Sequence, residues 1–297
     1  NGHNWPPKTP PYAGTFTGET MHSAHYRTAD VFVGKRVLVV GGGNSGCDIV
    51  VEAAQFGDKT WHSTRRGYYY MPKYLFGRPS DQVGDQMLAL GMPLWLRRFI
   101  ARVSYRVLVG SPARMGLPQP DHKLFETHPV VNTLLPYYVG QGDVTPKPDI
   151  ARFEGKTVHF VDGSSCEVDL IVYATGYNIE FPFIDKAHLN WVDGRPRLHQ
   201  HVFHPLYDTL FVAGLIQPDS GQFGLVHWQT KALAAFLRAA GEGRPSAQWL
   251  RDVKREPGTG YANPIRYKDS TRHFVEVEHW EYRRGLERTV QRLAASR

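Results

Sequence analysis

The clearest pattern of apolar and polar positions lies between Lys35 and Arg66. Residues 35–40 (KRVLVV) are a short, apolar, β-rich run that predicts a buried strand. A helix-forming stretch follows and ends at Gly57, and residues 58–63 (DKTWHS) predict a second strand. A strand, a helix and another strand in this order predict a βαβ unit with a parallel sheet, and therefore an α/β fold.

Two further strands are predicted around a turn at Asp162-Gly163. Residues 156–160 form the first run, and residues 167–173 form the second. The second run is apolar over almost its whole length, which is typical of a strand that is buried on both faces. We therefore expect a hairpin whose second strand continues into the centre of the sheet.

The last third of the chain predicts one short strand and two helices. Residues 209–213 (TLFVA) read as the strand, and the run from Gln222 to Ala240 reads as a helix that ends at Gly241. Residues 273–293 alternate apolar and charged groups, as a surface helix does. No chemistry is assigned to this last helix.

Residues 92–107 form an amphipathic helical pattern with a basic side. Its apolar stripe consists of Leu96, Phe99, Ile100, Val103 and Val107, and four arginines lie off that stripe. A basic amphipathic helix can lie on an anionic membrane. Packing of the stripe against the rest of the domain is the favoured interpretation. The segment belongs to an insertion over about residues 68–120, which we expect to shape substrate access.

Three glycines stand between the first strand and its helix. Gly41, Gly43 and Gly46 have the G-x-G-x-x-G spacing. The first permits the tight turn, the second lets a pyrophosphate approach the backbone, and the third lets the helix pack on the strand. The first helical turn, which includes Asn44 and Ser45, presents N–H groups and a partial positive charge to the phosphates. The pattern predicts a dinucleotide-binding site.

The end of the second strand indicates which dinucleotide binds. An NAD site has Asp or Glu about 20 residues after the first glycine, where it holds the ribose 2′-OH. This chain has Ser63, Thr64, Arg65 and Arg66 there, with no carboxylate. Two guanidinium groups and two hydroxyl groups suit a 2′-phosphate, which arginine binds bidentately, so NADP(H) is favoured over NAD(H). Thr64, Arg65 and Arg66 would hold that phosphate. The alternative is a solvated basic turn without a ligand.

Composition narrows the class of protein without changing this interpretation. The 297 residues leave room for about two domains, and 41% hydrophobic and 21% charged residues are ordinary for a globular protein. The net charge of +7 suits an anionic ligand, but no dense Lys/Arg run indicates nucleic acid. No apolar run is long enough to span a bilayer. The two cysteines predict a reducing, cytoplasmic location, with Cys47 as a buried filler.

Histidines and carboxylates cluster at one place in the chain. Asp121, His122, Glu126 and His128 do not have the spacing of a zinc site, and neighbouring prolines break any helix that would align them. No metal site is expected there.

A motif ahead of the glycines resembles a known family. Phe16, Gly18, His22 and Tyr26 match the identifying F-x-G-x-x-x-H-x-x-x-Y motif of flavin-containing monooxygenases (class B flavoprotein monooxygenases), which precedes their NADPH fingerprint. Related Baeyer–Villiger enzymes carry Trp in place of Tyr26. Similar stretches cover residues 41–46, 63–67 and 174–177, so the resemblance extends over nearly the whole chain. The N-terminal FAD fingerprint of the family is lacking, and we expect a chain that starts inside a longer design.

The resemblance implies a two-domain organisation. It predicts a Rossmann-like dinucleotide-binding domain together with the C-terminal part of a second, FAD-binding Rossmann-like domain. Residues 1–33 would be a linker and a remnant of the FAD domain, residues 34–174 the NADPH domain, and residues 175–297 the C-terminal part of the FAD domain. The segment Ala174, Thr175, Gly176 and Tyr177 would link the two domains, and Gln217 would lie near the isoalloxazine.

The function implied by the resemblance is NADPH- and FAD-dependent monooxygenation. NADPH would reduce FAD, and the reduced flavin would capture O2 as a C4a-hydroperoxide that oxygenates a soft nitrogen or sulfur of a small molecule. The catalytic asparagine of the family lies in the part that is lacking, so no catalytic residue is assigned. Two alternatives stay open: a Baeyer–Villiger-type oxygenase of ketones, and an incomplete NADP(H)-binding chain that a partner completes. A homodimer also stays open.

Overall fold

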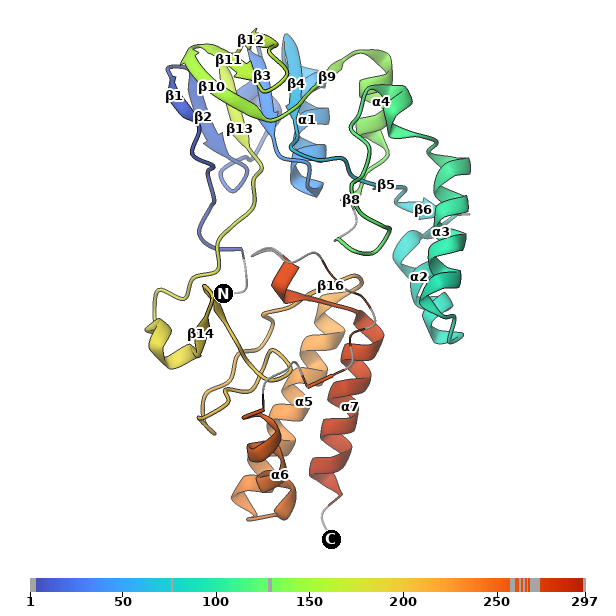
Figure 1. The fold of residues 1–297 in the computed structure, drawn as a ribbon, viewed down its shortest axis with the longest axis vertical. Helices are drawn as coiled ribbons and strands as arrows, with labels where there is room; N and C mark the ends of the chain where they lie inside the picture. The colour runs from blue at the N-terminus through green and yellow to red at the C-terminus, as the bar shows by residue number, and fades with distance from the viewer. Residues whose placement is uncertain are drawn as a thin grey trace.

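The computed structural model places two groups of elements one above the other (Figure 1). It describes residues 4–75, 77–127, 130–256, 260–261, 263, 265, 267 and 273–295. The first group holds the larger sheets, and the second holds the long helices α5 (Gln222–Gly241) and α7 (His279–Ala294). The buried apolar clusters of the first group draw on residues 32–174, and those of the second on residues 181–293.

A five-stranded parallel sheet forms the centre of the first group. Its strands are β2 (Glu19–His22), β13 (Leu170–Tyr173), β3 (Arg36–Val40), β4 (Lys59–Ser63) and β9 (Val144–Lys147), in this spatial order. The predicted βαβ unit and parallel sheet are confirmed. β13 lies between β2 and β3 with all four side chains buried, as its apolar run predicts.

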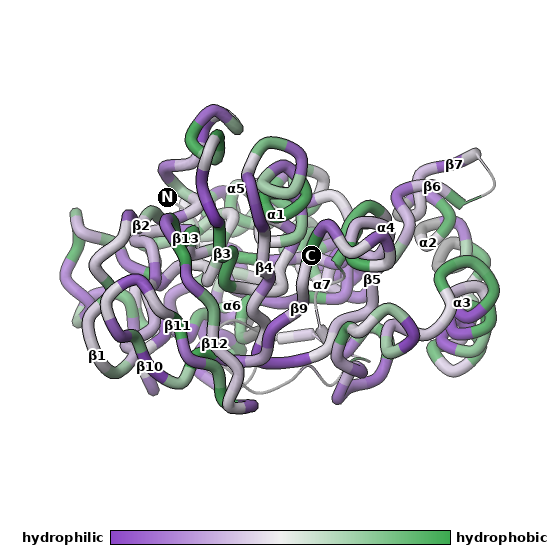
Figure 2. Tube along the Cα trace, turned by 90° about the horizontal axis from the view of Figure 1, so that it is seen from above, coloured by the Kyte–Doolittle hydropathy of each residue, from purple (hydrophilic) through white to green (hydrophobic). Residues whose placement is uncertain are grey.

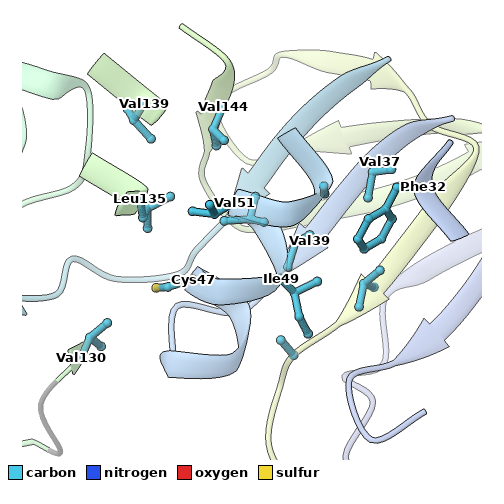
Figure 3. Packing of buried hydrophobic residues seen from close by; sticks show 14 of the residues in the cluster. Phe32, Val37, Val39, Cys47, Ile49, Val51, Val130, Leu135, Val139 and Val144 are labelled. Carbon is cyan, nitrogen blue, oxygen red and sulfur yellow. The ribbon is translucent and has the colours of Figure 1, made fainter. Parts of the chain in front are cut away.

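Helix α1 (Asn44–Phe56) covers one face of this sheet beside α4 (Leu134–Gln141). Figure 3 shows the packing: Ile49 of α1 lies beside Val39 of β3, and Val51 lies toward Leu135 of α4. Phe32 lies beside Val37 at one side of the cluster. Full burial of each large aliphatic side chain stabilises the fold by about 1.5–3 kcal/mol. α1 is therefore held on the sheet by its whole apolar face.

A four-stranded sheet adjoins the first and corrects the predicted hairpin. Its order is β1 (Ala13–Phe16), β10 (Ile150–Gly155), β11 (Thr157–Phe160) and β12 (Ser165–Glu167). The hairpin around Asp162-Gly163 exists, but its second strand is β12 alone. The chain then leaves the hairpin, and β13 enters the parallel sheet. The wrong prediction joined two strands of different sheets, because charged Glu167 and Asp169 were included in one apolar run.

The insertion extends to one side of the sheets (Figure 1). Its elements are β5 (Tyr70–Met71), β6 (Tyr74–Leu75), β7 (Arg78–Pro79), α2 (Ser80–Ala89), α3 (Leu94–Leu108), a 3₁₀ helix (Pro112–Met115) and β8 (Val130–Val131). β5 pairs with β8 in parallel. Tyr70 of β5 and Val130 of β8 belong to a buried apolar cluster of the first group, so this pair holds the insertion to that group. α2, α4 and β8 were not predicted from the sequence.

Helix α3 confirms the predicted helix but overturns its predicted packing. Phe99, Val103 and Val107 of the apolar stripe are 62%, 46% and 77% exposed. Arg97, which was expected off the packed face, is buried and lies 3.6 Å from a carboxylate oxygen of buried Glu278. An inward partner of opposite charge makes burial of this arginine tolerable, so the helix turns its basic side inward at this position.

The second group contains both predicted and unpredicted elements. A 3₁₀ helix (Lys186–Leu189), β14 (Trp191–Val192) and β15 (Arg195–Pro196) precede β16 (Gln217–Pro218), α5, α6 (Pro245–Val253), a 3₁₀ helix (His273–Val275), β17 (Glu276–Val277) and α7. The helix predicted from Gln222 is confirmed as α5. The strand predicted over residues 209–213 is wrong, because only Phe211 forms a bridge there, with Phe203.

The C-terminal helix has a more buried position than a surface helix. α7 packs along α5, and Tyr282, Leu286 and Leu293 are fully buried between them. The Tyr282 hydroxyl donates a hydrogen bond of 2.6 Å to the Gln200 carbonyl, which fixes the helix against the preceding loop. Within the described residues, no helix combines the length and apolarity required to cross a bilayer.

Candidate functional site

The glycine turn lies so close to neighbouring backbone that two of its glycines have no room for a side chain. A Cβ atom on Gly46 would lie 1.9 Å from the Gly41 carbonyl oxygen. A Cβ atom on Gly41 would lie 2.3 Å from the Ala174 carbonyl oxygen, and Gly41 itself has φ of +121°. Side chains at these positions would push the turn away from β13 and α1. The geometry is that of a turn kept thin enough for a ligand to approach its backbone.

The N-terminus of α1 suits an anion. Gly43 is its N-cap, and the first turn contains no acidic residue. The Asn44 side chain accepts a hydrogen bond of 2.8 Å from the Val131 backbone N–H, and Ser45 is exposed. A helix end without a carboxylate in its first turn presents its N–H groups and partial positive charge to a phosphate. The residues present therefore fit a dinucleotide pyrophosphate.

A buried histidine that was missed by the sequence reasoning holds the turn. His62 of β4 donates a hydrogen bond from Nε2 to the Gly41 carbonyl over 2.9 Å. Burial lowers the pKa of His62 to about 4, so the ring is neutral at ordinary pH. Its position in a strand predicted to be buried, directly before the basic end, could have indicated this role. The contact itself depends on the pairing of β3 and β4.

The end of β4 separates the four predicted 2′-phosphate residues into two kinds. Ser63 and Thr64 are buried, and the Ser63 hydroxyl donates a 2.7 Å hydrogen bond to the Pro148 carbonyl. The Thr64 N–H donates to the Lys147 carbonyl over 3.0 Å. Arg65 and Arg66 are exposed at the carboxyl edge of the sheet. Two guanidinium groups at this edge can bind an anion bidentately, and the two hydroxyl residues shape the backbone that carries them.

Buried Cys47 follows this turn within α1. Its thiol is fully buried and lies 3.8 Å from the Gly42 carbonyl. Burial raises the pKa of the Cys47 thiol, which keeps it protonated. The prediction of a filler residue is confirmed.

The motif from Phe16 to Tyr26 joins separate parts of the first group. The His22 Nδ1 atom accepts a hydrogen bond from the Ala24 N–H, so the ring proton sits on Nε2, which donates to the Gly176 carbonyl over 3.1 Å. The Tyr26 ring stacks on Phe32, and its hydroxyl donates to Glu52 of α1. The motif therefore connects the linker segment to α1.

Packing explains why the motif contains a glycine and an aromatic residue at Gly18 and Phe16. A Cβ atom on Gly18 would lie 2.6 Å from the ring of Phe16, and the Phe16 ring packs against Phe153 at 5.6 Å. The glycine is small because the aromatic ring folds back over it. Neither residue offers reactive chemistry.

The predicted linker from Ala174 to Tyr177 runs beside the N-terminal residues. The Ala174 N–H donates to the Val40 carbonyl at 2.8 Å, at the end of β3. The Thr175 hydroxyl donates to the Lys8 carbonyl, and the Lys8 N–H donates to the Gly176 carbonyl at 3.0 Å. The Tyr177 ring contacts His22 with centroids 5.2 Å apart. The structure thus brings this linker and the family motif together.

Gln217 begins a loop that leads to the N-terminus of α5. It lies in β16, and Gly221 is the N-cap of α5, whose first turn contains no acidic residue. Gln222 donates a 2.9 Å hydrogen bond to the Gly214 carbonyl, and Gln229 accepts one of 2.8 Å from the Gly214 N–H. Both bonds hold Gly214, three residues before Gln217, against α5. The partly positive helix end suits the electron-rich pyrimidine edge of a reduced flavin.

An apolar cavity of about 170 Å³ lies between the insertion and this loop. Tyr68, Ile100, Phe125 and Val131 are among its apolar lining residues, and Asp219 and Ser220 line it from the side of α5. The Tyr68 ring touches the glycine turn, because a Cβ atom on Gly42 would lie 2.2 Å from it. The cavity therefore extends from the neighbourhood of the dinucleotide turn to the neighbourhood of Gln217.

Two buried polar groups mark the wall of this cavity. The Tyr105 side chain is buried, and burial raises the pKa of its hydroxyl. Arg97 is buried beside the cavity, 3.6 Å from Glu278, whose other carboxylate oxygen accepts a 2.7 Å hydrogen bond from the Glu281 N–H. Burial raises the pKa of the Glu278 carboxyl. Through this pair α3 is held to the N-terminus of α7.

The histidine and carboxylate cluster of the insertion is engaged in local contacts. The His122 ring lies 3.0 Å from Asp121 through Nδ1 and 2.9 Å from Thr127 through Nε2. His128 lies outside the described residues. Within the described part of the chain, no three side chains gather as metal ligands.

Known proteins match this chain over almost its whole length. Residues 2–289 match the family described as flavin-binding monooxygenase-like. Flavin-containing monooxygenase 5 of Oryctolagus cuniculus is 32% identical over 282 residues, which is 90% of this chain and 50% of that protein. Flavin-containing monooxygenase 1 of Sus scrofa is 32% identical over 82% of this chain and 47% of its own length. The chain thus spans about half the length of the curated relatives that it matches.

Solved structures show the same fold. The closed structure of cyclohexanone monooxygenase has a TM-score of 0.62 at 17% identity, over 99% of this chain and 72% of that one. S-allyl-L-cysteine S-oxygenase from Allium sativum has a TM-score of 0.56 at 20% identity, over 98% of this chain and 53% of that one. The predicted α/β class with Rossmann-like domains is confirmed. By its sequence, the chain belongs to the flavin-binding monooxygenase-like family.

Proposed function

We propose that this chain is the NADPH-binding part, and the C-terminal part of the FAD-binding domain, of a longer NADPH- and FAD-dependent monooxygenase. Its substrates would be O2 and a small molecule with a soft nitrogen or sulfur. Family membership supports the cofactor pair. In this proposal the NADPH domain covers residues 34–174 with its insertion at about 68–120, and residues 175–297 belong to the FAD domain. The separate apolar clusters of the two groups support this division.

The observation that carries the proposal is the exposed pair Arg65 and Arg66 at the end of β4, beside the glycine turn. In a dinucleotide site this edge meets the ribose of the adenosine half. Two cations and no carboxylate favour a 2′-phosphate, which only NADP(H) carries. NAD(H) carries a 2′-hydroxyl in place of this phosphate, so Arg65 and Arg66 would gain no charged partner from it.

The chain's own residues would position the cofactors and the substrate. Bound NADPH would supply the hydride, and bound FAD would supply the chemistry with O2. His62 and Gly41 would keep the turn thin, and the N-terminus of α1 would hold the pyrophosphate. Gln217 and the N-terminus of α5 would lie beside the flavin ring. The adjoining cavity would receive an apolar substrate and exclude water from it.

Titration of the chain with NADPH and NADH tests the nucleotide assignment without any need for turnover. Arg65→Ala/Arg66→Ala should weaken NADPH binding about 10- to 100-fold, because charge-assisted hydrogen bonds contribute about 1.5–3 kcal/mol. NADH binding should stay unchanged. Arg288→Ala, at an exposed arginine of α7, serves as a matched control and should change neither affinity.

Equal binding of both nucleotides by parent and double variant would overturn the NADPH assignment. The oxygenase assignment needs a second measurement on the longer protein, with a sulfide and a ketone offered in turn. Oxygenation of the sulfide alone agrees with the proposal, and ester formation from the ketone would instead indicate a Baeyer–Villiger enzyme. If the purified protein is colourless and consumes no NADPH even with added FAD, the oxygenase assignment fails and only nucleotide binding remains.

A further inference from the structure

His122 of the insertion lies between a carboxylate and a hydroxyl group. Its Nδ1 atom is 3.0 Å from Oδ1 of Asp121, and its Nε2 atom is 2.9 Å from Oγ1 of Thr127. A carboxylate only accepts hydrogen bonds, so the ring proton is on Nδ1. Nε2 is then the acceptor, and the Thr127 hydroxyl donates its proton to it. A carboxylate, a histidine and a hydroxyl in this order are the arrangement that activates a hydroxyl as a nucleophile.

The surroundings hold the His122 ring in this orientation. The His122 side chain is 7% exposed, whereas that of Asp121 is 48% exposed. The Tyr69 ring contacts the His122 ring edge-on with centroids 5.5 Å apart, and it also contacts buried Tyr105 at 5.3 Å. A ring fixed by packing and by a carboxylate keeps its Nε2 atom directed at the hydroxyl, which is what the carboxylate of a hydrolytic triad achieves.

The hydroxyl residue of this arrangement lines the apolar cavity. Thr127 is one of the lining residues, together with Tyr69, Tyr105 and buried Arg97. A cavity of about 170 Å³ is large enough for a molecule of the size of benzene. The Arg97 guanidinium places a positive charge on the same lining, where it can stabilise an oxyanion. Figure 2 shows α2 and α3, which line this cavity, at one edge of the molecule.

We propose that Asp121, His122 and Thr127 form a hydrolytic triad that cleaves esters of small apolar acids in this cavity. Oγ1 of Thr127 attacks the ester carbonyl carbon, and its proton passes to Nε2 of His122. The bond from this carbon to the alcohol oxygen then breaks, and the leaving oxygen takes the proton. Water next attacks the acyl group on Thr127 and gives one proton to Nε2, and the acid leaves as Thr127 regains that proton. The reaction needs neither NADPH nor FAD, so it is independent of the proposed oxygenation.

Hydrolysis of p-nitrophenyl butyrate by the 297-residue chain, without NADPH or FAD, tests this proposal. The chain should release p-nitrophenol with saturation kinetics. His122→Gln removes the base and should lower kcat/KM at least about 100-fold, and Thr127→Val removes the nucleophile and should lower it as far. Asp121→Asn should lower kcat/KM at least about tenfold, because the ring loses the group that fixes its tautomer. Thr127→Ser keeps the hydroxyl and should stay active.

Covalent labelling separates a nucleophile from a hydroxyl that only holds the loop. Phenylmethanesulfonyl fluoride should sulfonylate Thr127 of the parent, as located by mass spectrometry, and His122→Gln should abolish the label. This result decides the case even where Thr127→Val fails to fold, which circular dichroism detects.

A matched control changes the same residue types elsewhere. His227→Gln/Thr230→Val alters exposed positions of α5 and should leave both hydrolysis and labelling unchanged. The proposal is wrong if the parent does not hydrolyse the ester, or if folded His122→Gln or Thr127→Val hydrolyses it as fast as the parent. Equal losses in the control, or a label on another residue in place of Thr127, would also contradict it.

Discussion

Helices α1 and α3 have similar lengths but opposite relations to the rest of the molecule. α1 spans 13 residues, and Ile49, Val50 and Val51 are at most 6% exposed because the sheet covers them. α3 spans 15 residues, turns Trp95 and Phe99 outward, and buries Arg97 and Tyr105. An amphipathic pattern therefore establishes that a helix forms. Which side is covered depends on what lies beside the helix in space.

The largest effect on stability is expected for a substitution in α1, the helix that the sheet covers. Gly46→Ala would place a Cβ atom 1.9 Å from the Gly41 carbonyl oxygen, so the helix has to move away from the turn. We expect a loss of about 4 kcal/mol in the free energy of unfolding, and loss of NADPH binding. Denaturant unfolding and nucleotide titration measure the two effects. Gly84→Ala in α2, where a Cβ atom meets nothing within 4 Å, is the control and should stabilise slightly.

The buried ion pair of α3 predicts a second, smaller effect. Arg97→Leu leaves the Glu278 carboxylate buried without its cation, which should cost about 3 kcal/mol. The double variant Arg97→Leu/Glu278→Gln should recover most of this loss, because glutamine keeps an acceptor for the Glu281 N–H without a charge. Urea unfolding of both variants measures the difference. Additive losses in the double variant would show that the two side chains do not interact.

The smallest effect on stability is expected on the outer side of α3, and it can be compared directly with a substitution in α1. Phe99→Ala should change the free energy of unfolding by less than about 0.5 kcal/mol, because the ring already faces solvent. Ile49→Ala in α1 should cost about 2–5 kcal/mol, because it leaves a cavity against the sheet. Parallel unfolding curves measure both. A large loss for Phe99→Ala would mean that the Phe99 side of α3 is covered within the protein.

Local signals in the sequence predicted the elements around the nucleotide turn. The strand, the glycines and the helix follow one another without interruption, so short-range pattern and the backbone demands of Gly41 and Gly46 are sufficient there. The predicted NADP(H) preference rests on adjacent residues for the same reason. The residues proposed to bind FAD stay predictions, and the nucleotide titrations test the assignment of Arg65 and Arg66 to NADPH.

Contacts between distant segments could not be read from the sequence. The hydrogen bond of His62 to Gly41 needs the pairing of two strands, and the burial of Arg97 needs Glu278, which lies 181 positions later in the chain. The split between β12 and β13 has the same origin, since only the presence of two sheets separates them. The hydrophobic pattern of a segment indicates whether it forms a helix or a strand, but it does not indicate which segment packs against it.

The central place of β13 has a consequence for how the protein is made. β13 separates β2 from β3, yet Asp169, just ahead of it, is 133 residues further along the chain than Arg36, its hydrogen-bond partner at the start of β3. At a synthesis rate of about 5–20 residues per second, β3 waits roughly 7–27 s on the ribosome for this neighbour. During that interval the facing edges of β2 and β3 have no partner strand, and Ala174 is not yet in place beside the nucleotide turn. Ribosome-bound chains that end before residue 170 should therefore depend on chaperones until the sheet closes.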